Sequence, residues 1–106
     1  MLDAQLLVLD LIRSLCPIVE RVRVGDASLS TQIMRAASSV ALNLAEGRER
    51  RGADRRRVYR LAAAEAQEVR AAIEVVAAWG LADETTLVAA RALADRVGAV
   101  THVLAR

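Results

Sequence analysis

The sequence predicts an all-α protein, with residues 1–106 folded as one domain, an antiparallel up-and-down four-helix bundle. Apolar residues recur at spacings of three and four in successive stretches, as on the buried faces of amphipathic helices. Short connections that contain Gly and Asp separate these stretches, so consecutive helices should be antiparallel. The chain is 55% apolar, but Phe is absent and the aromatic residues are Tyr59 and Trp79. The core should therefore consist of Ala, Leu, Val and Ile.

The first helix is expected over residues 2–24. Its main apolar row is formed by Val8, Leu11, Leu15, Ile18 and Val22. Pro17 lacks an N–H group and clashes with the carbonyl group of Arg13, so we expect a kink near residues 13–16 or two shorter helices. Cys16 is the only cysteine, which excludes an intrachain disulfide, and we expect it to be a small core residue.

The second helix should begin at a cap, Asp26 or Ser28, and run to about Arg50. Its apolar stripe is formed by Leu29, Ile33, Ala36, Ala37, Val40 and Leu44. Gly47 lies near the end of this helix and could permit the close approach of another backbone. Gly52 is a stop signal beyond it.

The third helix is expected from an N-cap at Asp54 to Trp79, and the fourth should begin at a cap on Asp83. Glu65 falls within the apolar stripe of the third helix, so its carboxylate should lie at the bundle edge or pair with an arginine. Trp79 is expected to anchor the core or the rim at the end of the bundle. His102 has no second His or Cys at the spacing of metal ligands.

A polar row also follows the second helix at helical spacing, and it consists of Gln32, Arg35, Ser39, Asn43 and Glu46. This row is either the solvated side of an amphipathic helix or a polar seam, inside the bundle or between subunits. Serine and asparagine are mediocre helix formers, because their side chains compete for backbone hydrogen bonds. In a buried seam such groups would fix the register of the helices.

The net charge is only +2, but residues 48–60 hold seven arginines against Glu49 and Asp54, a local charge of +5. The candidate nucleic-acid-binding residues are Arg48, Arg50, Arg51, Arg55, Arg56, Arg57 and Arg60. A helical hairpin would bring them to one end of the bundle, where the N-terminus of the third helix adds positive potential. This favours an anionic partner such as the phosphates of RNA or DNA, held without sequence specificity. The alternatives are a solvated face or salt bridges between subunits.

The stretch from Leu29 to Gly47 reads LxxQxxRAAxSVxxNxAEG and is followed by arginines. It resembles the family of small four-helix bundles encoded by intervening sequences in bacterial large-subunit ribosomal RNA genes. The accessory variability protein of diversity-generating retroelements is similar to the same family. The resemblance covers roughly residues 26–80, with a second block from Leu61 through Glu68 and then at Trp79 and Gly80. Within that block the family usually has Gly-Ser where this chain has Ala-Glu.

This resemblance implies a barrel-like homopentamer. In the retroelement relatives the bundle partners a reverse transcriptase and binds nucleic acid through a basic surface. A core of small side chains also leaves apolar surface uncovered, which favours oligomerisation.

The sequence contains no nucleophile–base pair, glycine-rich phosphate loop or zinc motif, so we expect no enzymatic activity, no cofactor and no metal. It also lacks a signal peptide pattern and a run of about 18 apolar residues, so we expect a cytoplasmic protein without a membrane partner. Two hypotheses follow. The first is a non-enzymatic oligomeric accessory protein that binds RNA or DNA non-specifically, and the second is a protein–protein scaffold whose arginines make intersubunit salt bridges.

Overall fold

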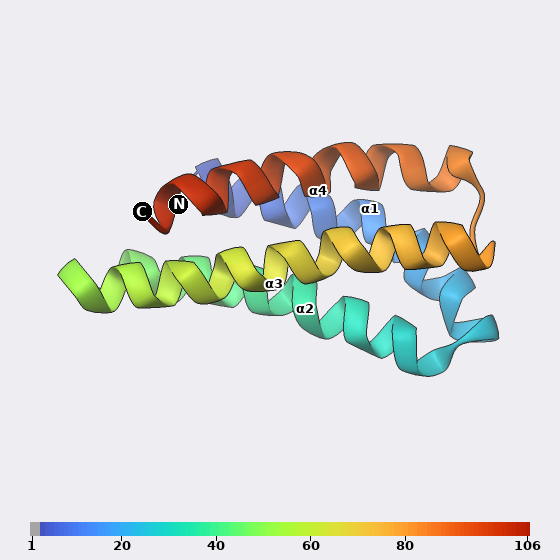
Figure 1. Cartoon of the computed structure of the whole chain (residues 1–106), viewed down its shortest axis with the longest axis horizontal. Helices are drawn as coiled ribbons and strands as arrows, with labels where there is room; N and C mark the ends of the chain where they lie inside the picture. Colours follow the sequence, from blue (N-terminus) through green and yellow to red (C-terminus); the bar gives the residue numbers. More distant parts are fainter. Residues whose placement is uncertain (1–2) are drawn as a thin grey trace.

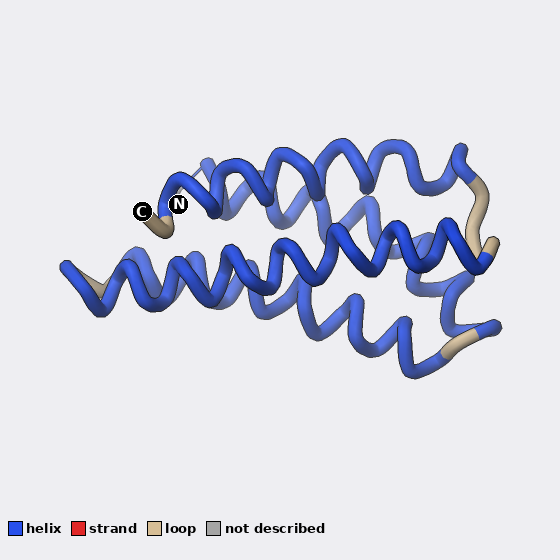
Figure 2. Tube along the Cα trace, in the orientation of Figure 1, coloured by secondary structure: helices blue, strands red, loops and turns tan. Residues whose placement is uncertain are grey.

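The computed structural model describes residues 3–106, which form four helices and, within that range, no strand. The helices are α1 (Asp3–Gly25), α2 (Ala27–Arg48), α3 (Gly52–Trp79) and α4 (Glu84–Leu104). Each helix packs against the next one in the chain, and α4 packs against α1, which closes the bundle. Both chain ends and the α2–α3 connection lie at the same end of the molecule (Figure 1). Figure 2 shows how little of the chain lies outside the helices. The predicted all-α antiparallel four-helix bundle is confirmed.

Buried side chains line the inner face of each helix at the expected spacing. The predicted row of α1 is at most 3% exposed, and five of the six predicted residues of α2 are buried, while Leu29 is half-buried. The largest fully buried side chains are Leu11, Ile18, Ile33, Leu44, Ile73 and Leu87. The core is therefore aliphatic, as its composition requires.

Pro17 lies within α1, which is one continuous helix, so of the two alternatives that of two shorter helices is excluded. Pro17 and Arg13 both lie on the exposed face of α1. The carbonyl group of Arg13 has no intrahelical donor, because Pro17 lacks an N–H group, and it therefore lies on the side of the helix that water can reach.

Cys16 is also exposed, and the prediction that it is a core residue was wrong. The buried row steps from Leu15 to Ile18, which turns Cys16 outward.

Two of the predicted helix caps are formed. The Asp26 carboxylate accepts a hydrogen bond from the N–H of Leu29 at 3.0 Å. The Asp83 carboxylate accepts from the N–H and the hydroxyl of Thr86 at 2.9 and 2.7 Å. These hydrogen bonds hold the pKa of Asp83 below its ordinary value.

The predicted cap at Asp54 was wrong, because α3 begins two residues earlier, at Gly52. Gly52 has a φ of +56°, which lets the chain turn directly into the helix after Arg51. Asp54 therefore lies in the first turn of α3, where its negative charge faces the positive end of the helix dipole.

Trp79 is 75% exposed, so the prediction that it anchors the core or rim was wrong. Leu81 and Ala82, from the connection to α4, cover that end of the core instead. Leu81 packs closely on Gly25. A Cβ atom on Gly25 would lie 2.6 Å from Leu81 Cδ2, so only a glycine leaves room for this contact. No described helix is long and apolar enough to cross a membrane.

Candidate functional site

The connection between α2 and α3 is held by a contact that requires a glycine. Gly47 is buried, and the ring of Tyr59, itself 6% exposed, packs against it. A Cβ atom on Gly47 would lie 2.7 Å from Tyr59 Cδ1, closer than such atoms approach. The absence of a side chain at Gly47 therefore lets α3 lie close to α2, although the group packed on this glycine is the Tyr59 ring and not the backbone that was expected.

Arg55 holds the same connection by capping α2. Its Nε and Nη2 atoms donate to the carbonyl oxygens of Gly47 and Arg48, each at 3.0 Å. The Gly47 carbonyl oxygen also accepts from the N–H of Arg50 at 3.1 Å, so the Arg55 guanidinium adds a second donor there and supplies a donor to the Arg48 carbonyl at the end of α2. Arg55 is therefore a structural residue within the predicted arginine site.

Arg50 and Arg57 are also engaged, with acidic groups of the same corner. Arg50 lies 2.8 Å from Glu46 and 3.1 Å from Asp54, and Arg57 lies 3.1 Å from the second oxygen of Asp54. The hydrogen bond from Arg57, more than any other contact, holds the pKa of Asp54 below its ordinary value. These pairs are exposed to solvent, so they orient the side chains and contribute little to stability.

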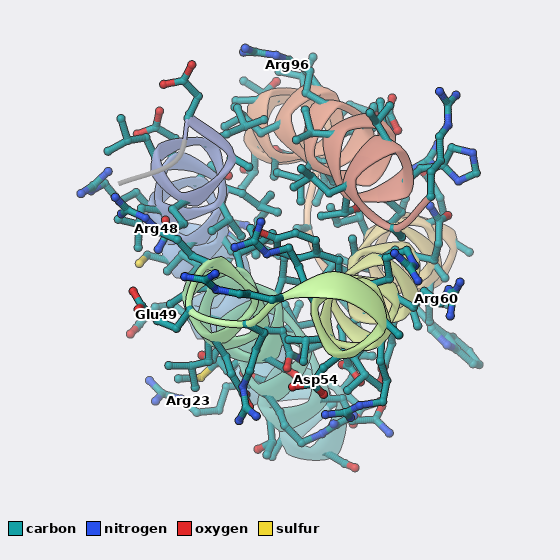
Figure 3. The ribbon with its side chains drawn as sticks, turned by 90° about the vertical axis from the view of Figure 1, so that its left-hand side faces the viewer. Arg23, Arg48, Glu49, Asp54, Arg60 and Arg96 are labelled. Atoms are coloured by element: carbon teal, nitrogen blue, oxygen red, sulfur yellow. The ribbon has the colours of Figure 1, made fainter. Side chains whose placement is uncertain are left out.

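The other four arginines of the cluster are exposed and make no hydrogen bond or ion pair with any described residue. They are Arg48, Arg51, Arg56 and Arg60, hereafter the free arginines. The bundle seen from the end of the α2–α3 connection is drawn in Figure 3. Arg48 and Arg60 lie on opposite sides of the connection, with Asp54 between them (Figure 3). The structure thus brings all seven predicted arginines to one end of the bundle and divides them into three engaged and four free.

The predicted polar seam lies on the surface of the chain rather than in its core. Gln32, Arg35 and Glu46 are exposed, whereas Ser39 and Asn43 are half-buried. Asn43 Nδ2 donates to Ser39 Oγ at 3.1 Å, so this pair is satisfied within α2.

The side chain of Arg35, which belongs to the same polar row, extends to α3 and contacts Glu68 at 3.0 Å and Glu65 at 3.9 Å. The expectation that Glu65 lies at the bundle edge near an arginine is confirmed. Its Oε2 atom is buried without a hydrogen-bond partner. Burial raises the pKa of Glu65, the negative charge of Glu68 raises it further, and Arg35 opposes both. The sequence places Glu68 one turn from Glu65 on the same helix face, but it does not indicate that Arg35 contacts both.

Two further ion-pair groups, which sequence reasoning also missed, join α3 to α4. Arg91 contacts Glu74 at 2.9 Å and Glu84 at 2.7 Å, and Arg70 contacts Asp95 at 3.0 Å. All of these residues except Glu84 line a surface hollow of about 300 Å³ between these helices. Since every one of these charges has an opposite partner, the hollow has little charge left to offer a ligand.

Within residues 3–106 no group of three or more His, Cys, Asp or Glu side chains is arranged to hold a metal ion. No curated protein and no solved structure matches this sequence. A family match was found, described as 23S rRNA-intervening sequence protein, and it spans residues 6–102. This match reaches from the first turns of α1 to the last turn of α4, beyond the motif between residues 26 and 80. The chain therefore belongs to the family of 23S rRNA-intervening sequence proteins.

Proposed function

We propose that this chain is a non-enzymatic accessory protein that binds RNA or DNA without sequence specificity. The binding surface is the corner formed by the free arginines. One observation carries the proposal: four exposed guanidinium groups at one end of the bundle have no acidic partner among residues 3–106, while the other three arginines there are engaged. Arg51 is the N-cap residue of α3, where an unpaired positive charge is costly without an anion.

Phosphate is the anion that these side chains suit best. The planar guanidinium group can donate two parallel hydrogen bonds to phosphate oxygens, and it stays charged at every physiological pH. Contacts of this kind fix the position of a protein on nucleic acid without reading its sequence. Binding should therefore weaken as the salt concentration rises.

The proposal includes self-association into a homopentamer, as the family resemblance implies. Large apolar side chains remain exposed on every helix, and examples are Leu6, Met34, Leu42, Val75 and Val88. An apolar surface of this extent on a chain with a small aliphatic core favours contact with other copies. A reverse transcriptase or another protein is the further partner that the resemblance suggests. Light scattering should give a particle of five times the 11.4 kDa of one chain.

The competing function is a protein–protein scaffold, in which the free arginines form salt bridges with acids of a neighbouring subunit. Exposed acids without a partner in the described chain, such as Asp3 and Glu49, favour this alternative. The two functions differ in what the free arginines hold together: protein and nucleic acid, or two protein subunits.

One experiment separates them. Labelled RNA and DNA are titrated at low and moderate salt with wild type and with Arg48→Ala, Arg51→Ala, Arg56→Ala and Arg60→Ala combined. A control replaces four arginines elsewhere, Arg13, Arg21, Arg23 and Arg96, and so removes the same total charge. The proposal requires that binding is lost in the first variant and kept in the control. No binding at micromolar wild-type protein, together with loss of the oligomer in the first variant, would establish the scaffold instead.

A further inference from the structure

The shape of the arginine corner bears on which form of nucleic acid it binds. We infer, on the basis of the proposed function, that the corner binds double-stranded nucleic acid by its phosphates and does not read or stack the bases. Three features of the corner carry this inference: its width, the positions of Arg48 and Arg60 on opposite sides of it, and the burial of the one aromatic ring near it.

The corner is too wide for a groove. A helix with its side chains measures about 10–12 Å, and packed helices lie about 8–10 Å apart, so α2 and α3 together span about 18–22 Å. The whole bundle measures 22 × 19 Å in cross-section. The major groove of B-form DNA is about 12 Å wide, and that of A-form RNA is deep and narrow. The two helix ends therefore rest across a groove more readily than they enter it.

Two of the free arginines lie at the sides of the corner (Figure 3). Arg48 and Arg60 lie on opposite sides of the connection, and the carboxylate of Asp54 lies between them (Figure 3). Asp54 is already paired with Arg50 and Arg57, so the charges at the centre of the corner are engaged within the chain. Side chains placed on either side of it can reach the two phosphate strands that border a groove.

Base stacking is not available at this corner. Tyr59, the nearest aromatic residue, is 6% exposed and packs under Gly47. Trp79 is exposed but stands 20 residues further along α3, which is about 30 Å at 1.5 Å per residue. Proteins that bind single strands combine basic grooves with aromatic rings on which bases stack. A duplex instead offers one negative charge per about 1.7 Å of its axis, which suits a compact group of arginines.

The test compares a duplex of about 20 base pairs with each of its single strands, in G·C-rich and A·T-rich versions, by fluorescence anisotropy across a salt series. We expect tighter binding to the duplex and less than about threefold difference between the two compositions. Four phosphates neutralised by one corner predict a slope of log K against log salt near −3.6, at about 0.9 per phosphate. This slope should fall towards zero when the four free arginines are replaced by alanine. Trp79→Ala should leave duplex binding unchanged.

The contrary results distinguish a failure of the duplex inference from a failure of the proposed function. Binding to single strands as tight as or tighter than binding to the duplex would overturn the duplex inference and leave the proposed function standing. A preference of more than about tenfold for one base composition, or a loss of affinity in Trp79→Ala, would do the same. The absence of salt-dependent binding to any of these probes would overturn the proposed function itself.

Discussion

Replacing Gly47 with alanine should destabilise the bundle, although alanine is the better helix former. The added Cβ atom would lie 2.7 Å from Tyr59 Cδ1. The ring of Tyr59 is 6% exposed and has little room to move, so either the ring or one of the two helices must shift. Overpacking of this kind costs about 1–3 kcal/mol, and the helix propensity of alanine returns up to about 1 kcal/mol. We expect a net loss of about 1–2 kcal/mol.

The assay is thermal unfolding followed by circular dichroism at a fixed protein concentration, since self-association would shift the midpoint. For a chain of this size the loss corresponds to a decrease in Tm of about 5–10 °C. Gly98→Ala is the matched control. A Cβ atom there would lie 3.1 Å from Arg70 Cδ, on a long side chain that can move aside. The control should be neutral or slightly stabilising.

A second variant isolates the contact. In a Tyr59→Ala background the space beside Gly47 is open, so adding Gly47→Ala should no longer reduce stability. A single Gly47→Ala variant that is as stable as wild type would refute the argument that this glycine is required for the approach of α3 to α2.

Three further predictions concern the same region. Arg55→Ala should lower the free energy of unfolding by about 1 kcal/mol, because the Arg48 carbonyl loses its donor and the Gly47 carbonyl keeps only the N–H of Arg50; urea unfolding measures this, and an unchanged midpoint would exclude the capping role. Glu65→Gln should raise stability at pH 7 and have no effect well below pH 4.5, its ordinary pKa. Burial raises the pKa of Glu65 in the folded chain, so wild type loses stability as the pH rises through that folded pKa. Melting temperatures of both proteins at several pH values measure this difference. A Glu65→Gln variant less stable than wild type at pH 7 would contradict the prediction. If the polar seam lies between subunits, Asn43→Leu should change the particle mass in light scattering; an unchanged mass and melting temperature would place Asn43 in solvent.

The features that the sequence predicted correctly depend on local chemistry. The caps at Asp26 and Asp83 follow from an acid placed directly before a periodic apolar stretch. The buried rows of α1 and α2 follow from the helical repeat alone. Gly47 was recognisable because a glycine near the end of a helix usually has a steric or conformational reason.

The wrong predictions concern residues whose surroundings depend on the rotation and the ends of the helices. Cys16 lies only one position beyond buried Leu15, yet that step turns it into solvent. Trp79 was expected to cover the end of the core, but Leu81 and Ala82 already fill that position. Both outcomes depend on packing partners that a helical repeat does not specify.

The division of the arginine cluster could not be predicted either. Arg50 and Arg57 meet acids three or four residues away, a spacing that a sequence can indicate. Arg55, in contrast, donates to carbonyl groups seven and eight residues earlier, which requires the turn between two helices. The pair of Arg35 and Glu68 spans 33 residues and requires the register of α2 against α3.

The most direct test of the central claim is the affinity of the wild-type chain for a nucleic acid duplex, measured beside the variant that lacks the four free arginines. The account predicts salt-dependent binding by wild type and its loss in the variant, with the melting temperature and the particle mass unchanged. Equal binding by both proteins, or no binding by wild type at low salt, would contradict it.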